Sequence, residues 1–385
     1  MFKSNFDLYQ LNLVLYMVKY FLSFIILFHC TYGNNIENYL NLAGDNQYQL
    51  IKALNQISAD KRKGLSWLIK RMPLEDLKTL SSDYLLSNTS LAYEAWTNSP
   101  WFRSIPENIF LDNILPYANL NERRDNRREE FRKMFLPLIS DAKSPSEAAA
   151  ILNNSIFEKL NVVYSTKRPK ADQSPGESIK AGLASCTGLS ILLISACRSV
   201  GIPARFVGTS NWYDNSGNHS WVEIWDDGWH FTGAAEPTEF RLNDGWFIEK
   251  ASKAQKGSLE YGIFSVTWNK VFDNHFPMDW LPGVESYRSY DVSDYYNQVL
   301  SDSDSSLVPI SFRVFDSEGQ RKSKEITISG PDNFFFRGLS KNEENDTNDN
   351  LIVRLPRGKM FKAVVDSEER QFTVINESLI DFKVD

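Results

Sequence analysis

Cysteine is scarce in this chain of 385 residues, which contains only Cys30, Cys186 and Cys197. The last two lie in one segment of helical character, where eleven residues separate their Cα atoms by about 16 Å, too far for a disulfide. Neither has a partner at the spacing of metal ligands. The sequence therefore predicts free thiols, no metal site and no cofactor.

An excess of positive charge is also missing, because the formal net charge is −7. The stretch richest in Lys and Arg, Glu122 to Lys133, interleaves Glu and Asp and is typical of a solvated helix face. Nucleic acid binding needs a basic surface. We therefore expect no nucleic acid partner.

Long apolar runs are absent from the N-terminus. Lys19 precedes an apolar stretch from Phe21 to Phe28, and small residues follow up to Gly33. This stretch is shorter than the about 20 apolar residues that a spanning helix needs. Residues 1–33 are therefore expected to be a cleaved secretory signal, which predicts a secreted or extracytoplasmic protein. A membrane anchor is the alternative.

The rest of the composition is ordinary for a globular protein, with 42% hydrophobic and 13% aromatic residues. At this length two or three folding units are expected. Apolar residues recur at helical spacing from Leu50 to Met72 and Pro73 then ends that pattern, so residues 34–143 are predicted to be a helical lead domain. A new helix with Ser144 as its cap opens the predicted core domain, residues 144–290.

Strands are predicted after a helix that ends at Gly201. Ser220–Trp225 and Trp229–Thr232 are aromatic and β-branched, and Asp226-Asp227-Gly228 between them is typical of a hairpin turn. Residues 291–306 are predicted to be a polar linker. Alternating patterns in residues 307–385 predict a β-sandwich of about seven strands. The fold class expected is α+β, with a helix packed on an antiparallel sheet in the core.

Cys186 occupies the first turn of the apolar helix, in Ala184-Ser185-Cys186-Thr187-Gly188. The free amides and the dipole at a helix N-terminus favour a thiolate. A thiol nucleophile also needs an imidazole to accept its proton. His219 begins a predicted strand, in Asn218-His219-Ser220-Trp221-Val222-Glu223, and is one of four histidines in the chain. Cys186 is therefore predicted to be the nucleophile and His219 its general base, while His230 is expected to be structural.

These pieces resemble the core of the transglutaminase-like superfamily of papain-like Cys-His thiol enzymes. The resemblance covers residues 146–246 and depends on three features: Cys186 opening a helix, the turn Gly201-Ile202-Pro203-Ala204-Arg205, and the His-x-Trp-x-Glu pattern that starts at His219. The wider stretch from Phe110 to Phe247 is similar to a secreted microbial-type branch. The resemblance implies an acyl-transfer enzyme.

The third catalytic position departs from the family pattern. Relatives usually carry an aspartate four residues after the tryptophan of the strand that follows the histidine, and here this position is Gly233. Glu236 is predicted to orient the imidazole instead, with a plain solvated carboxylate as the alternative. By analogy with papain-like enzymes, Gln173 is predicted as an oxyanion-hole donor. Trp212 is predicted to line the substrate channel, or else simply to pack.

The function expected from this resemblance is thiol-dependent acyl transfer on amide bonds of peptides or proteins, with hydrolysis favoured over cross-linking because water is the more abundant acceptor. The alternative is an inactive binding or scaffold protein, which Gly233 favours. The expected partner is a peptide or protein substrate. The C-terminal domain is a further candidate for contact with a surface or a carbohydrate.

Overall fold

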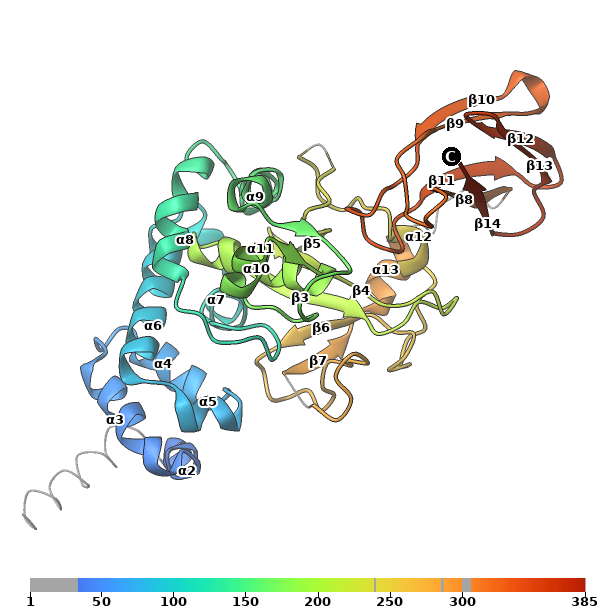
Figure 1. The fold of residues 1–385 in the computed structure, drawn as a ribbon. Coiled ribbons are helices and arrows are strands. Elements are labelled where there is room, and N and C mark those ends of the chain that lie inside the picture. Colours follow the sequence, from blue (N-terminus) through green and yellow to red (C-terminus); the bar gives the residue numbers. More distant parts are fainter. Residues whose placement is uncertain (1–33, 239, 285–286, 300–305, 385) are drawn as a thin grey trace, which may run out of the picture. The chain divides into compact units, whose positions relative to one another are not determined.

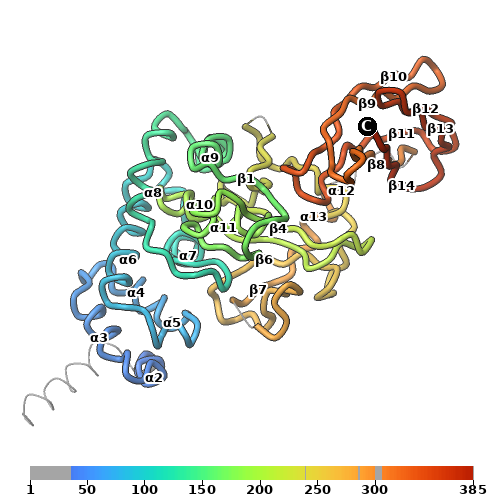
Figure 2. The backbone as a smooth tube through the Cα atoms, in the orientation of Figure 1, coloured from blue at the N-terminus to red at the C-terminus, as the bar shows by residue number. Residues whose placement is uncertain are grey.

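The computed structural model describes residues 34–238, 240–284, 287–299 and 306–384 and confirms the α+β fold class (Figure 1). The predicted signal at 1–33 lies outside these residues. None of the helices described is long and apolar enough to cross a membrane. Three regions follow one another along the chain: helices, a central sheet with helices, and C-terminal strands (Figure 2).

The N-terminal region is helical, and its first compact unit ends at Ser90. Its helices are α2 (Asn34–Leu42), α3 (Gln47–Gln56), α4 (Arg62–Ile69), α5 (Leu74–Thr79), α6 (Ser82–Thr97), α7 (Glu107–Asn113) and α8 (Arg128–Phe135). The apolar residues at helical spacing, Leu50, Leu54, Leu65 and Leu68, are fully buried, as expected for one face of each helix. Helix α8 packs on the core helix α11. The domain boundaries at 143 and 290 stay predictions.

The core is a five-stranded sheet in the order β5-β4-β3-β6-β7, with all neighbours antiparallel. The strands are β3 (Ala204–Thr209), β4 (His219–Trp225), β5 (Trp229–Thr232), β6 (Phe264–Thr267) and β7 (Arg288–Asp291). The helices are α9 (Pro145–Leu160), α10 (Pro175–Ala181), α11 (Cys186–Ser199), α12 (Ile248–Ala251) and α13 (Ser293–Val299). Two short strands, β1 (Val163–Tyr164) and β2 (Leu183–Ala184), pair in parallel just before α11.

Helix α11 packs against β3 and β4 and is buried along almost its whole length. Its sequence has no charged residue until Arg198, which is itself buried and donates hydrogen bonds to the carbonyls of Asn113, Ala204 and Ala118. Because a helix with apolar residues all round can be stable only inside a core, α11 is the central element of the domain.

A buried ion pair joins strands β3 and β4. Arg205 and Glu223 are directly opposite each other in the sheet, and the guanidinium Nε donates to a Glu223 oxygen at 2.6 Å. Tyr296 donates to the other oxygen at 2.6 Å, and Trp221 donates its indole N–H to Tyr296. The buried charges of Arg205 and Glu223 therefore compensate each other, which is a physical reason for the Pro-Ala-Arg turn and the Trp-x-Glu strand to occur together.

The C-terminal region consists of two facing sheets around one apolar core. The strands are β8 (Leu307–Phe315), β9 (Glu325–Ser329), β10 (Phe335–Leu339), β11 (Leu351–Pro356), β12 (Met360–Val365), β13 (Glu368–Thr373) and β14 (Ser378–Lys383). One sheet has the order β10-β9-β12-β13 and the other β11-β8-β14. Alternate residues of β8 are buried, so the period-two pattern read from the sequence is confirmed. Part of the predicted linker, residues 293–299, is helix α13.

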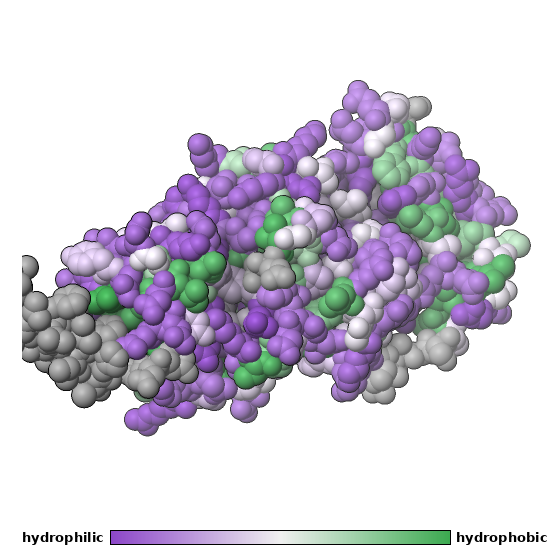
Figure 3. Space-filling model, turned by 90° about the horizontal axis from the view of Figure 1, so that it is seen from below, coloured by the Kyte–Doolittle hydropathy of each residue, from purple (hydrophilic) through white to green (hydrophobic). Residues whose placement is uncertain are grey.

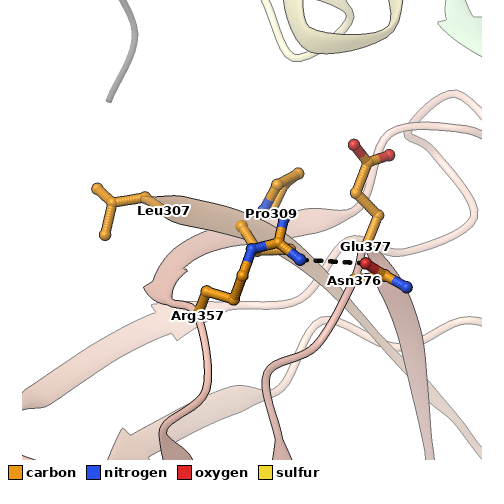
Figure 4. A pocket seen from close by; sticks show the side chains of 6 residues that line it. Leu307, Pro309, Arg357, Asn376 and Glu377 are labelled. Atoms are coloured by element: carbon orange, nitrogen blue, oxygen red, sulfur yellow. Dashed lines mark hydrogen bonds between the residues drawn. The ribbon is translucent and has the colours of Figure 1, made fainter. Parts of the chain in front are cut away.

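Apolar side chains on the surface are scattered rather than continuous. The face in Figure 3 is mostly hydrophilic, with separate apolar patches. A pocket of about 240 Å³ lies on the C-terminal sandwich, where Arg357 donates a hydrogen bond to Asn376 at 3.1 Å (Figure 4). Its lining contains Leu307, Pro309 and Glu377 but no thiol and no imidazole, so it is not the site of the predicted chemistry.

Candidate active site

Cys186 is the first residue of α11 and lies next to the cap of that helix. The Ser185 hydroxyl accepts a hydrogen bond from the Gly188 amide at 3.1 Å and donates one to the Ala171 carbonyl at 2.5 Å. These bonds fix the position of the thiol at the N-terminus of the helix. Cys186 is partly exposed, whereas Cys197 is buried within the same helix.

His219 begins β4, in register with Thr209 at the end of β3. It is only 1% exposed, and its ring is surrounded by Trp212, Trp246 and Phe247, with centroid distances of 6.2, 4.6 and 5.2 Å. These aromatic contacts hold the ring in place. The nearest polar groups to it are one thiol and two carboxylates.

Glu236 lies in the turn after β5 and approaches His219 from one edge, with its Oε2 3.7 Å from Nε2. Asn153 of α9 holds this turn, because its amide donates to the Gly233 carbonyl at 2.8 Å and accepts from the Ala235 amide at 2.9 Å. A Cβ at position 233 would collide with Oε2 of Glu236. The glycine that departs from the family pattern is thus the residue that leaves space for the Glu236 carboxylate.

Asp346 approaches the other edge of the ring, with its Oδ2 3.4 Å from Nδ1 of His219. It comes from the loop between β10 and β11 of the C-terminal sandwich and is 3% exposed. One ligand atom each from Cys186, His219 and Asp346 lie within 4.8 Å of one another. These three side chains form a cluster that resembles a catalytic triad. No sequence pattern points to Asp346, which is 127 residues beyond His219 in a polar loop rich in Asn and Asp.

The charges of these groups are coupled. Burial alone would lower the pKa of His219, but Glu236 and Asp346, together with polar contacts to Asp346 and Cys186, raise it well above 6.5. Burial alone would raise the pKa of Asp346, but the His219 charge and polar contacts more than offset this and lower it below 3.8. Both shifts favour the charged forms of His219 and Asp346, each in part because of the other.

Other predicted residues have defined contacts. Gln173 is buried and donates its side-chain amide to the Leu183 carbonyl at 3.0 Å, which links its loop to the strand before Cys186. Trp212 is 2% exposed and stacks on Trp221 with ring centroids 6.1 Å apart. Both proposed roles, oxyanion donor for Gln173 and channel wall for Trp212, stay predictions. Burial favours the packing alternative for Trp212.

His230 contacts groups away from the thiol. Its Nε2 is 3.1 Å from the Asp226 carbonyl and its Nδ1 is 2.8 Å from the Asn243 amide. Both ring nitrogens therefore have partners in the hairpin and in the segment after Glu236, which fits the structural role expected for it. Burial raises the pKa of Cys197 to about 12, so this second thiol is inert at neutral pH.

Side chains of the types that bind metals lie close together beside Cys186 in the described residues. In that part of the chain, Cys186, His219 and Asp346 are the group of three ligand-type side chains close enough together to hold an ion. Thiolate, imidazole and carboxylate are ligands that Zn²⁺ accepts. The same three side-chain types also occur together in Cys-His-Asp catalytic triads.

One family model and several solved structures are similar to parts of this chain. Residues 133–234 match the model of the transglutaminase-like superfamily. Among solved structures, the chain is similar to a proposed cysteine protease from Cytophaga hutchinsonii (16% identity, 44% of this chain and 60% of that one, TM-score 0.26). It is also similar to red sea bream transglutaminase (10% identity, 72% and 66%, TM-score 0.34). A third is a proposed protease from Parabacteroides distasonis ATCC 8503 (11% identity, 74% and 54%, TM-score 0.24).

The chain covers less than two thirds of the length of each of these three proteins. A comparison with curated proteins gives no match. The resemblance read from the motifs around Cys186 and His219 is confirmed by the family model.

Proposed function

We propose that the transglutaminase-like domain of this chain is a thiol-dependent acyl-transfer enzyme that acts on amide bonds of peptides or proteins, with water as the favoured acceptor. The observation that carries the proposal is the arrangement of Cys186, at a helix N-terminus, beside the buried His219, whose two ring nitrogens each face a carboxyl group. We extend the proposal to a secreted location.

The chemistry follows from the roles that these groups can take. The Cys186 thiolate attacks the amide carbonyl, and His219 as imidazolium gives its proton to the departing amine as the carbon–nitrogen bond breaks. A thioester remains on Cys186. Water then attacks the thioester while His219 accepts one of its protons, and the carboxylic acid leaves as the thiolate is restored. An amine acceptor in place of water would give cross-linking with the same residues.

Glu236 is the proposed orienting acid, because its Oε2 approaches Nε2 of His219, the nitrogen opposite the one that Asp346 approaches. A carboxylate on the far nitrogen fixes the ring tautomer and stabilises the imidazolium. The Cys186 backbone amide and Gln173 are the proposed donors to the oxyanion. The space at Gly233 supports the orienting role of Glu236, because it leaves room for the Glu236 carboxyl group beside His219.

Activity on a fluorogenic casein digest and on an activated ester tests this proposal. The wild-type protein should release product, and Cys186→Ala and His219→Ala should abolish it. His230→Ala is the matched control and should retain activity, because its ring bonds only to the hairpin and to Asn243. Turnover that survives Cys186→Ala would contradict the proposal, and absence of turnover in every protein would favour the binding or scaffold function.

A further inference from the structure

We infer that the loop of residues 340–350 in the C-terminal sandwich is an intramolecular cap, and that Asp346 occupies the place beside the Cys186 thiol where the acyl group of a substrate must bind. The inference rests on the proposed function, to which it adds a closed and an open state.

The space beside the Cys186 sulfur is partly filled by the Asp346 carboxyl group. A carbonyl carbon has to come within about 3–3.5 Å of the thiolate sulfur to react. An Asp346 oxygen already lies within 4.8 Å of that sulfur and 3.4 Å from Nδ1 of His219. A substrate carbonyl cannot reach the sulfur from the imidazole side while this carboxylate is there.

Proton transfer by His219 requires access to its ring nitrogens. Both ring nitrogens of His219 are buried, and neither has a well-formed hydrogen bond. A general base must touch the leaving amine and later the attacking water. Neither can reach the ring in this arrangement, so a catalytically competent site requires that a neighbouring group moves. The turn that carries Glu236 is held inside the core by the hydrogen bonds of Asn153 with Gly233 and Ala235. Asp346, in contrast, belongs to a loop of the C-terminal sandwich.

Hydrogen bonds within the sandwich hold the loop that carries Asp346. Within the sandwich, Arg321 donates to the carbonyl of Asp346 at 2.9 Å and also to that of Asp349. The Asp346 Oδ1 accepts the Asn348 amide at 2.8 Å, which leaves Oδ2 to face His219. The sandwich thus holds Asp346 in a defined conformation of its own, and the carboxylate can dock and undock as part of a preformed loop.

The loop contacts the core through hydrogen bonds with Tyr164 and Asn218. The phenol oxygen of Tyr164 is 3.0 Å from the Thr347 hydroxyl and accepts the Thr347 amide at 3.2 Å, and Asn348 donates to the Asn218 carbonyl at 3.5 Å. These bonds are polar, and so are the ion pairs of Lys253 with Glu377 and of Glu249 with Arg354, which join the sandwich to the core outside the loop. The apolar cluster of the sandwich contains only residues of its own domain, so opening leaves that core intact.

Cys186 alkylation by iodoacetamide, followed by peptide mapping in the presence of EDTA, tests the cap. Asp346→Asn keeps the bond to the Asn348 amide but removes the charge that pairs with His219. It should alkylate about tenfold faster than the wild type, because charge-assisted contacts are the stronger ones. Tyr164→Phe should give a smaller rise of about 3- to 10-fold, from the loss of its contacts with Thr347.

The matched control is Asp381→Asn, which removes one carboxylate from an exposed pair with Arg313 on β14 and β8 and should leave the alkylation rate unchanged. Hydrolysis of the activated ester should rise in Asp346→Asn together with alkylation. An unchanged rate in Asp346→Asn overturns the cap. Loss of hydrolysis in Asp346→Asn, as deep as in His219→Ala, also overturns it and makes Asp346 the acid of the catalytic triad.

These readouts separate the two proposals. Faster alkylation in Asp346→Asn without acyl transfer in any variant would support the cap and contradict the enzymatic function. Wild-type hydrolysis equal to that of Asp346→Asn, with equal alkylation, would support the enzyme and overturn the cap.

Discussion

Gly233→Ala should separate the Glu236 carboxylate from His219 without disturbing the fold. Gly233 does not adopt a left-handed φ, so an alanine is conformationally allowed there. The added Cβ would collide with Oε2 of Glu236, which must then turn away from its position 3.7 Å from Nε2. Loss of a fully hydrogen-bonded orienting acid lowers turnover by about 10⁴-fold. Because this contact is longer than a hydrogen bond, we expect a loss of about 10- to 100-fold in kcat/KM, or about 1.4–2.7 kcal/mol.

The assay is kcat/KM for the activated ester in a double-mutant cycle. Glu236→Ala should lose activity to about the same degree as Gly233→Ala, and the double variant should be no worse than Glu236→Ala alone, because the carboxyl atoms that the new Cβ would collide with are then gone and only the Cβ of residue 236, at 3.0 Å, remains. Melting temperatures of all four proteins check that the fold persists. Full activity in Gly233→Ala, or losses that add in the double variant, would refute the assignment of Glu236 as the orienting acid.

Cys186 should react with iodoacetamide at neutral pH while Cys197 stays unmodified until the protein unfolds. The reason is that a pKa of about 12 leaves only about one part in 10⁵ of Cys197 as thiolate. Peptide mapping measures both alkylation rates, and equal rates would contradict this prediction. Glu223→Leu should lower the free energy of unfolding by about 3–5 kcal/mol in urea titrations, because it leaves a buried guanidinium unpaired. The raised pKa of His219 gives stability below pH 6.5 that is lost as pH rises through its folded value, and the lowered pKa of Asp346 gives stability above pH 3.8 that is lost as pH falls. The wild type should therefore exceed Asp346→Asn in melting temperature most clearly near pH 5, and a gap independent of pH would contradict this pairing.

The nucleophile and the base could be predicted from the sequence because local rules fix their surroundings. A cysteine at the start of an apolar helix and a histidine at the start of a strand are visible as patterns. The C-terminal sandwich could be predicted for the same reason, since alternate residues of β8 face its core.

Asp346 could not be predicted, because its place depends on how a loop of one domain meets the site of another. A polar loop has no periodicity, and nothing in residues 340–350 distinguishes Asp346 from Asp349. The position of Glu236 was only partly predictable. Its reach toward His219 depends on the Asn153 clamp and on the space left by Gly233, which are contacts between residues far apart in the sequence.

The most direct test of the enzymatic account is intact-protein mass spectrometry after brief mixing with the activated ester and an acid quench. The account predicts one acyl group per chain, located on the peptide that contains Cys186, released by hydroxylamine and absent from Cys186→Ala. An acyl group on any other residue, or none on the wild type while it turns the ester over, would contradict the thioester mechanism.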